Sequence, residues 1–289
     1  MTIAVTLETW RARMSADMRL RDYQPRTEEA YLLAVRVFLE WAKKEPGDVD
    51  DADLRAYFLY LREDRKLAPS SIDVALHGLR FFFMRTMRRD WAVFDLVRVK
   101  KPRKLPVVLA RSEVRQILAA VEHPVRRVAF ATIYGLGLRL GEGLALETDQ
   151  IDGERLMVSV RDGKGRRDRA VPLPRPVLAL LRRYWKTARP RSATSYLFVA
   201  ESGRGPLHET TLQKTFSAAL ADSGVKKAAS IHTLRHSYAT HLVEAGISVR
   251  TVQELLGHKS MRTTEIYMHV TQPGFERVQE TLDRLMRDL

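Results

Sequence analysis

Two prolines and a cluster of basic residues interrupt the chain about a third of the way along its length. Residues 97–110 read VRVKKPRKLPVVLA. A proline disfavours helix in the residue before it, and like charges in series favour an extended segment. The segment therefore predicts a linker over 98–110, an N-terminal domain over 1–97 and a C-terminal domain over 111–289.

Apolar residues before the linker recur at helical spacing, with no alternating run long enough to suggest a sheet. Helices are expected over 7–20, after Pro25 with Thr27 as the cap, after the acidic opening at Asp50, and from Pro69. Their aromatic and aliphatic stripes are typical of a core. The N-terminal domain is therefore predicted to be all-helical.

After the linker, one stretch alternates as a strand does. Residues 155–161 read RLMVSVR, the turn DGKG follows, and 169–173 return, which predicts a β-hairpin with Lys164 at its tip. The remaining pattern predicts helices over 112–121 (capped by Ser112), 124–134, 176–187, 209–222, 233–245, 248–256 and 261–268. The predicted fold class is mainly α with a small antiparallel β-sheet in the C-terminal domain.

The chain carries 49 Lys and Arg against 35 Asp and Glu, a formal net charge of +14. Such an excess favours polyanions as partners, with nucleic acid the first candidate. The sequence has no cysteine, no signal-peptide pattern and no apolar run of the roughly 18 residues that a membrane span needs. We therefore expect a cytoplasmic, nucleoid-associated protein with no membrane partner.

Residues 230–270 combine helical spacing with polar side chains. His232 and Arg235 are three residues apart and share one face of a helix. The apolar face of that helix is a different one, formed by Leu234, Tyr238, Leu242 and Ala245. Because the core does not need His232 and Arg235, both are expected to project into a cleft.

The next helix is expected to stop at Gly257, a geometry that aims His258 towards the neighbouring cleft. Tyr267 follows on a short helix. His232-x-x-Arg235, Leu256-Gly257-His258 and Tyr267, at these separations, closely resemble the second conserved box of the tyrosine recombinases, also called the phage integrase family.

Upstream, residues 134–142 read YGLGLRLGE and resemble the first box of the same family, which supplies a further arginine, here Arg139. Lys164, between Gly163 and Gly165, resembles the family's hairpin lysine. The resemblance covers the whole chain in layout, and about 134–270 in specific motifs.

The resemblance implies a two-domain DNA clamp, in which a helical, SAM-like core-binding domain is joined to a tyrosine-recombinase catalytic domain. It implies a site-specific DNA recombinase that cleaves and rejoins duplex DNA through a 3′-phosphotyrosine intermediate, for integration, excision or resolution. The catalytic residues that it implies are Arg139, Lys164, His232, Arg235, His258 and Tyr267.

The residue types suit phosphoryl transfer. Arg139 and Arg235 offer forked, permanently charged donors for the phosphate oxygens, and His258 adds another donor. A tyrosine, whose reference pKa is about 10, needs help to lose its proton at neutral pH. By resemblance, His232 takes part in that proton transfer.

The resemblance gives Glu142 a supporting role, the orientation of His232. Lys164 is the expected general acid for the leaving 5′ oxygen. One position departs from the family pattern: Gly143 stands where an apolar residue is usual, and glycine costs roughly 1 kcal/mol in a helix relative to alanine. We expect it to loosen the helix without abolishing activity.

No cofactor is expected, since the phosphotyrosine conserves bond energy and neither ATP nor a divalent cation is needed. Three histidines, His232, His236 and His241, invite a zinc interpretation. Their spacing is not His-Glu-x-x-His and no cysteine helps, so no metal site is predicted.

The expected partner is a duplex DNA recombination site, bound by a homotetramer that acts alone or with a paralogous recombinase; no small-molecule substrate is expected. The tail helix over 275–286 either packs on its own domain or, as the resemblance implies, docks on a neighbouring protomer; we expect the exchange. Basic residues expected to contact the DNA backbone are Lys100, Lys101, Arg103, Lys104, Arg166 and Arg167.

Two other functions remain open. A type IB topoisomerase uses the same chemistry on one strand and relaxes supercoiled DNA of any sequence. A non-catalytic accessory DNA-binding protein of the same fold predicts a damaged catalytic set, whereas every expected residue type is present in this chain.

Overall fold

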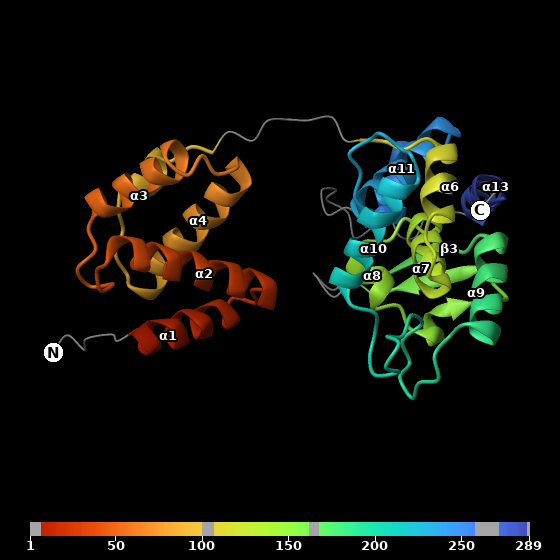
Figure 1. Cartoon of the computed structure of the whole chain (residues 1–289), viewed down its shortest axis with the longest axis horizontal. Helices are drawn as coiled ribbons and strands as arrows, with labels where there is room; N and C mark the ends of the chain where they lie inside the picture. Colours follow the sequence, from red (N-terminus) through yellow and green to blue (C-terminus); the bar gives the residue numbers. More distant parts are fainter. Residues whose placement is uncertain (1–6, 100–106, 162–167, 258–271, 288–289) are drawn as a thin grey trace. The chain divides into compact units, whose positions relative to one another are not determined.

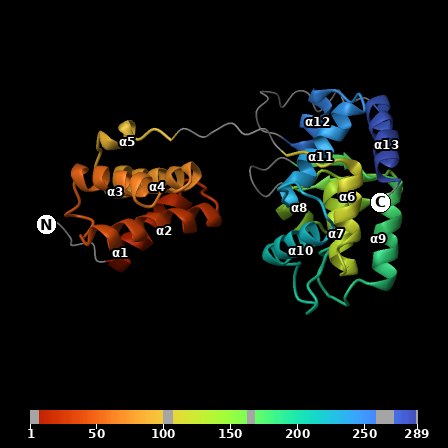
Figure 2. The same ribbon diagram turned by 45° about the horizontal axis from the view of Figure 1, so that its top comes forward.

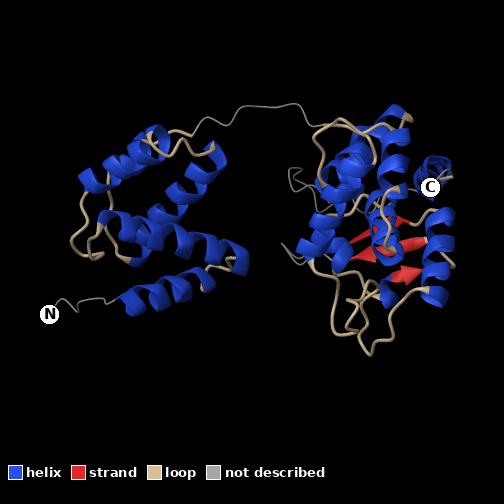
Figure 3. Ribbon diagram, viewed as in Figure 1, coloured by secondary structure: helices blue, strands red, loops and turns tan. Residues whose placement is uncertain are grey.

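The structure is a computed structural model that describes residues 7–99, 107–161, 168–257 and 272–287. The chain divides into two compact units, Met1–Lys104 and Leu105–Leu289 (Figure 1). Helices dominate both units, and the described strands all lie in the second (Figure 3). The prediction of a mainly α fold with a small antiparallel sheet is therefore confirmed.

The first unit is a helical bundle around an aromatic core. Its elements are α1 (Leu7–Arg19), α2 (Pro25–Ala42), α3 (Asp51–Glu63), α4 (Pro69–Phe81), a π-helical turn (Phe82–Thr86) and α5 (Val93–Leu96). Phe38 of α2 is fully buried, and its ring centroid lies 5.0 Å from that of Tyr57 in α3 and 6.0 Å from that of Phe83. Aromatic pairs of this kind add to the apolar burial that holds the bundle together.

The start of α3 follows the sequence expectation and the start of α2 does not. Asp50 caps α3, since its side chain accepts from the backbone N–H of Asp53 at 2.9 Å. The prediction of Thr27 as the cap of α2 is wrong, because the cap residue is Gln24 and Pro25 opens the helix. Proline suits that position because its φ is already helical and a first-turn N–H has no partner within the helix.

The second unit places helices around a three-stranded sheet. Its elements are α6 (Arg111–Ala119), α7 (Pro124–Gly135), α8 (Leu140–Leu144), a 3₁₀ turn (Thr148–Gln150), β1 (Ile151–Asp152), β2 (Met157–Val160), β3 (Arg169–Pro172), α9 (Arg175–Thr187), α10 (Glu209–Asp222), α11 (Ile231–Glu244), α12 (Val249–Leu256) and α13 (Gln272–Met286). In Figures 1 and 2, α7 lies in the middle of the unit, with α8 on one side and α9 on the other. The second unit is therefore built around α7, which is buried along most of its length.

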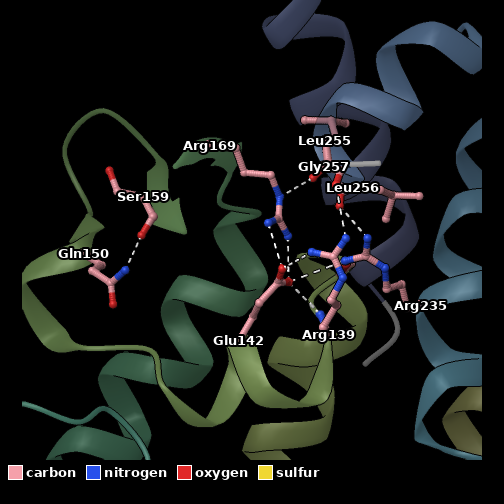
Figure 4. A network of polar contacts seen from close by, with 10 residues as sticks. Arg139, Glu142, Gln150, Ser159, Arg169, Arg235, Leu255, Leu256 and Gly257 are labelled. Atoms are coloured by element: carbon pink, nitrogen blue, oxygen red, sulfur yellow. Dashed lines mark hydrogen bonds and ion pairs between the residues drawn. The ribbon is translucent and has the colours of Figure 1, made fainter. Parts of the chain in front are cut away.

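The predicted hairpin is present as β2 and β3, which pair antiparallel with Val160 opposite Arg169 and Val158 opposite Val171. β1 adds a third strand beside β2 that the sequence pattern did not predict, since two residues are too few to show an alternation. Gln150 secures the sheet, because its Nε2 donates to the backbone carbonyl of Ser159 at 2.5 Å (Figure 4).

The start of α6 corrects another expected cap. Ser112 lies inside the helix, and the residue that precedes α6 is Ala110. Glu113 contributes to the helix start, because its carboxylate accepts from the backbone N–H of Ala110 at 2.6 Å. No helix within the described residues has the length and apolar character to cross a membrane.

In the structure, α13 packs on its own domain, whereas exchange to a neighbouring protomer was expected. Val278, Leu282 and Leu285 are buried against the core of the second unit. Asp283 accepts from the backbone N–H of Arg175 at 2.7 Å, at the start of α9, where a carboxylate is favoured by the helix dipole. Helical spacing reveals the apolar face of such a helix but not which copy of the chain receives it.

Gly143 has a packing role that the family pattern did not suggest. A Cβ at this position would lie 2.7 Å from Cγ1 of Ile133 in α7. Gly141, in the same short helix, has open space where its Cβ would be. The glycine at 143 therefore allows α8 to approach α7 closely, which explains the departure from the family pattern.

We predict that Gly143→Ala lowers the free energy of unfolding by about 1–3 kcal/mol, because the added methyl group overpacks the contact between α7 and α8. Gly141→Ala is the matched control, and it should leave stability unchanged or raise it by up to about 1 kcal/mol through helix propensity. Urea denaturation of both variants measures the difference. Equal stabilities would contradict the packing role of Gly143.

Candidate active site

Glu142 lies at the centre of a cluster of arginines in the second unit (Figure 4). Arg139 precedes α8 with an extended backbone, φ −69° and ψ 152°. Its backbone N–H donates to Oε2 of Glu142 at 2.7 Å, and its guanidinium donates through Nη1 to Oε1. The first turn of α8 therefore holds the two side chains against each other.

Arg169, the first residue of β3, pairs with both oxygens of the same carboxylate. Its Nη1 donates to Oε1 at 2.9 Å and its Nη2 donates to Oε2 at 2.8 Å. Arg235 of α11 also approaches, with Nη1 3.5 Å from Oε2. Three guanidinium groups from three elements therefore share one carboxylate.

The same three arginines bind consecutive carbonyl groups at the C-terminal end of α12. Nε of Arg169 donates to the carbonyl of Leu255 at 2.7 Å, Nη2 of Arg235 donates to that of Leu256, and Nη2 of Arg139 donates to that of Gly257 at 3.1 Å. The last carbonyls of a helix have no partner within it and form the negative end of its dipole. The cluster therefore satisfies this end of α12.

Two glycines let these groups approach one another. Gly257 ends α12 as predicted, with φ +64°, and a Cβ there would lie 3.2 Å from Cδ of Arg169. Gly137 has φ +61°, and a Cβ there would lie 2.5 Å from the ring of Tyr238. The carbonyl of Gly137 accepts from Nη1 of Arg235 at 2.8 Å. The backbone conformations at both positions favour glycine.

The cluster is ionised and carries a surplus of positive charge. Burial would raise the pKa of Glu142, but the hydrogen bonds and charge of Arg169, together with Arg139, hold it at about 2. Burial lowers the pKa of Arg235 to about 10, against the opposing effect of Glu142. Within the part of the chain that the structure describes, three cations then face one anion at neutral pH. Because the Arg139 side chain is 38% exposed, this charge can reach an anionic substrate.

His232 and Arg235 lie on α11 as expected, but only one of them is exposed. His232 faces solvent, whereas the Arg235 side chain is 8% exposed and is held by carbonyls. Arg235 therefore faces the cluster around Glu142, while His232 lies at the surface. Ala245 is also exposed rather than part of the apolar face, because α11 ends at Glu244.

The contacts of Glu142 differ from the role that the resemblance gave it. Both carboxylate oxygens accept hydrogen bonds from arginine, and Oε2 also accepts the backbone N–H of Arg139. Glu142 therefore orients guanidinium groups rather than His232.

The other two histidines of α11 lie in different environments. His241 is buried, and its Nδ1 shares a hydrogen bond of 2.8 Å with the hydroxyl of Tyr134 in α7. His236 is exposed. Within the described residues, no group of His, Cys, Asp and Glu is arranged to hold a metal ion.

Several expected site residues lie outside the described part of the chain. They are the catalytic candidates Lys164, His258 and Tyr267 and the DNA-contact candidates Lys100, Lys101, Arg103, Lys104, Arg166 and Arg167. The expected helix over 261–268 also lies there.

Sequence reasoning did not identify Arg169. A signal was present: strand alternation places Arg169, Val171 and Leu173 on one side of the hairpin, and Ala170 on the other. A charged residue on the apolar side of a strand requires a partner. The structure shows Arg169 buried at 4% exposure and Val171 fully buried, while Ala170 is exposed.

Comparison with known proteins identifies the family. Residues 107–273 match the phage integrase family, and residues 10–93 match the phage integrase N-terminal SAM-like domain. The chain belongs to the phage integrase family. It is thus a tyrosine recombinase, an enzyme of site-specific DNA recombination.

The chain aligns with its relatives over most of their length. A putative integrase/recombinase of Sinorhizobium fredii is 38% identical over 261 residues, 90% of this chain and 84% of that protein. Tyrosine recombinase XerA of Thermococcus kodakarensis is 34% identical over 266 residues, 90% of each chain.

Two solved structures show the same fold. A lambda integrase dimer bound to a core site has a TM-score of 0.70 and 20% identity, covering 90% of this chain and 99% of that one. XerH bound to its difH substrate has a TM-score of 0.66 and 22% identity, covering 87% and 78%.

The recombinase should lose a specific part of its stability in acid. The folded pKa of Glu142, about 2, lies below its ordinary value of 4.5, so its contribution is complete above that value and is lost as the pH falls towards 2. We predict that Glu142→Gln lowers the free energy of unfolding by roughly 3 kcal/mol at neutral pH, and that this deficit shrinks between about pH 5 and pH 2.

Urea denaturation of wild type and variant across this pH range measures the deficit. Glu147→Gln is the control, since it removes a carboxylate from an ion pair with the exposed Arg161 and should cost less than about 1 kcal/mol. A Glu142→Gln deficit that is independent of pH would show that the carboxylate charge does not stabilise the cluster.

Proposed function

We propose that this recombinase cleaves and rejoins duplex DNA through a 3′-phosphotyrosine intermediate, with Tyr267 as the nucleophile. The observation that carries the proposal is the arginine cluster, in which Arg139, Arg169 and Arg235 face the single carboxylate of Glu142. Phosphoryl transfer develops charge on the non-bridging phosphate oxygens. A fixed cationic cluster is suited to stabilise that charge.

Arg139 and Arg235 are the proposed phosphate ligands. The carbonyls of Gly137 and Leu256 fix the orientation of the Arg235 guanidinium before any substrate arrives. A donor that is already oriented costs no reorganisation during the reaction. Arg139 is the more exposed of the two and would meet the phosphate from the solvent side.

In the proposed reaction, the phenolic oxygen of Tyr267 attacks phosphorus and the bond from phosphorus to the 5′ oxygen breaks. His232 takes the phenolic proton, Lys164 protonates the leaving 5′ oxygen, and His258 donates a hydrogen bond to the phosphoryl group. A 5′ hydroxyl of another strand then attacks the phosphotyrosine and releases Tyr267. The number of phosphodiester bonds is conserved, so the reaction requires neither ATP nor a divalent cation.

The proposed substrate is a duplex recombination site held by a homotetramer. Lambda integrase has been solved as a tetramer bound to a Holliday junction, and XerH has been solved on difH DNA. These relatives support a synaptic assembly. In it, the linker over 98–110 would contact phosphates. Such contacts should make the affinity fall steeply with salt.

We predict that wild type forms a covalent adduct with a nicked suicide substrate from DNA that flanks the gene, and that Tyr267→Phe forms none. Loss of the phenolic oxygen removes the nucleophile, so adduct yield should fall below detection on a denaturing gel. Tyr196→Phe is the control, because it removes a hydroxyl from the same domain and should leave the yield unchanged.

Two further results would distinguish the remaining functions. Relaxation of supercoiled plasmid without a specific site would favour a type IB topoisomerase. Tight DNA binding at low salt with no adduct from wild type would favour an accessory protein or one that depends on a paralogous recombinase.

A further inference from the structure

Arg169 has no step in the proposed chemistry, yet each of its three guanidinium nitrogens is bound within the cluster. One planar guanidinium donates to both oxygens of Glu142 and to the carbonyl of Leu255. Its side chain is 2% exposed, compared with 38% for Arg139. It therefore cannot serve as a surface contact for DNA.

We propose that Arg169 is a positioning residue, which fixes β3 and the C-terminal end of α12 against α8 so that the catalytic groups on these segments meet at one phosphate. The inference rests on the proposed function for the roles of those groups. It assigns Arg169 a task that none of them performs, because its side chain is buried and its three guanidinium nitrogens are bound within the cluster.

The hydrogen bonds of Arg169 fix β3, α8 and the C-terminal end of α12 relative to one another. The Nη1 and Nη2 bonds to Glu142 are 2.9 and 2.8 Å long and the Nε bond to Leu255 is 2.7 Å long. Because the three donors belong to one rigid plane, a shift of β3 relative to α8 or α12 breaks at least one bond. A lysine has a single nitrogen and cannot reproduce this arrangement.

The segments that Arg169 joins lead directly to catalytic candidates. Lys164 precedes Arg169 by five residues, and His258 follows Leu255 by three. Arg139 and Glu142 flank the start of α8, the third element. An error of about 1 Å in the placement of reacting groups can cost a hundredfold in rate.

Stability alone is a poor explanation for Arg169. A buried ion pair can often be replaced by apolar residues without loss of stability, since burial of the charges offsets their attraction. Arg161, at the end of β2, offers a comparison within the same hairpin. It pairs with Glu147 and Asp149 at 2.8 Å each, but its side chain is 54% exposed, and these partners belong to neither α8 nor α12.

The test compares Arg169→Gln and Arg169→Lys with two controls. Arg161→Gln removes the same charge from the neighbouring strand, and Leu181→Ala destabilises the domain from α9, away from the cluster. For each variant, thermal melting sets a temperature at which the protein is fully folded. Single-turnover cleavage of the nicked substrate is then measured at saturating enzyme, and DNA affinity by gel shift.

We expect cleavage to be about 100-fold slower for Arg169→Gln and about 10-fold slower for Arg169→Lys. DNA affinity should stay within about 3-fold of that of Arg161→Gln, because the substitution changes the placement of the catalytic groups and not the charged groups that bind DNA. Cleavage by both Arg169 variants at the rate of Leu181→Ala would overturn the proposal. Where Arg169→Gln does not fold, Arg169→Lys decides.

Amide hydrogen exchange provides a readout that does not depend on activity. Exchange at the end of α12, over 252–257, should accelerate in Arg169→Gln and Arg169→Lys but not in Arg161→Gln. Unchanged exchange would also overturn the proposal. A wild-type protein that shows this coupling but forms no adduct would instead contradict the proposed function.

Discussion

The second unit depends on the hydrogen bonds and ion pairs that the carboxylate of Glu142 makes. A buried carboxylate needs partners, and here both oxygens are bound by guanidinium groups from β3 and the start of α8, with that of α11 nearby. The guanidinium groups in turn bind the last carbonyls of α12. Four elements that are distant in sequence are therefore held by one anion and one helix end.

Close packing of these elements explains three glycines in and beside the two conserved boxes. Gly137 and Gly257 have positive φ and lie against the ring of Tyr238 and the side chain of Arg169, while Gly143 lies against Ile133. Gly143, inside α8, would be scored as a local weakness from helix propensity alone. Tertiary packing overrides propensity at this position, since a side chain there would push α8 away from Ile133 of α7.

Sequence reasoning predicted what depends on local spacing. Helical periodicity gave most helices to within a few residues, alternation gave the hairpin, and the motif spacing gave Arg139, Arg235 and the family. It did not find the pairing of Arg169 with Glu142, nor that of Tyr134 with His241, because these partners are 27 and 107 residues apart. Caps at Thr27 and Ser112 were wrong because a proline and a glutamate nearby satisfied the helix start in another way.

The charge balance of the cluster connects its structure to its chemistry. Among the described residues, three guanidinium groups lie around one carboxylate, a local surplus of positive charge in a largely buried region. Such a surplus opposes folding, since like charges at short range repel more strongly where water is excluded. The carbonyl dipoles of α12 offset part of this cost without neutralising the charge. A phosphate bound at Arg139 would add negative charge to the cluster, so the feature that opposes folding of the free protein is the one suited to attract and orient its proposed substrate.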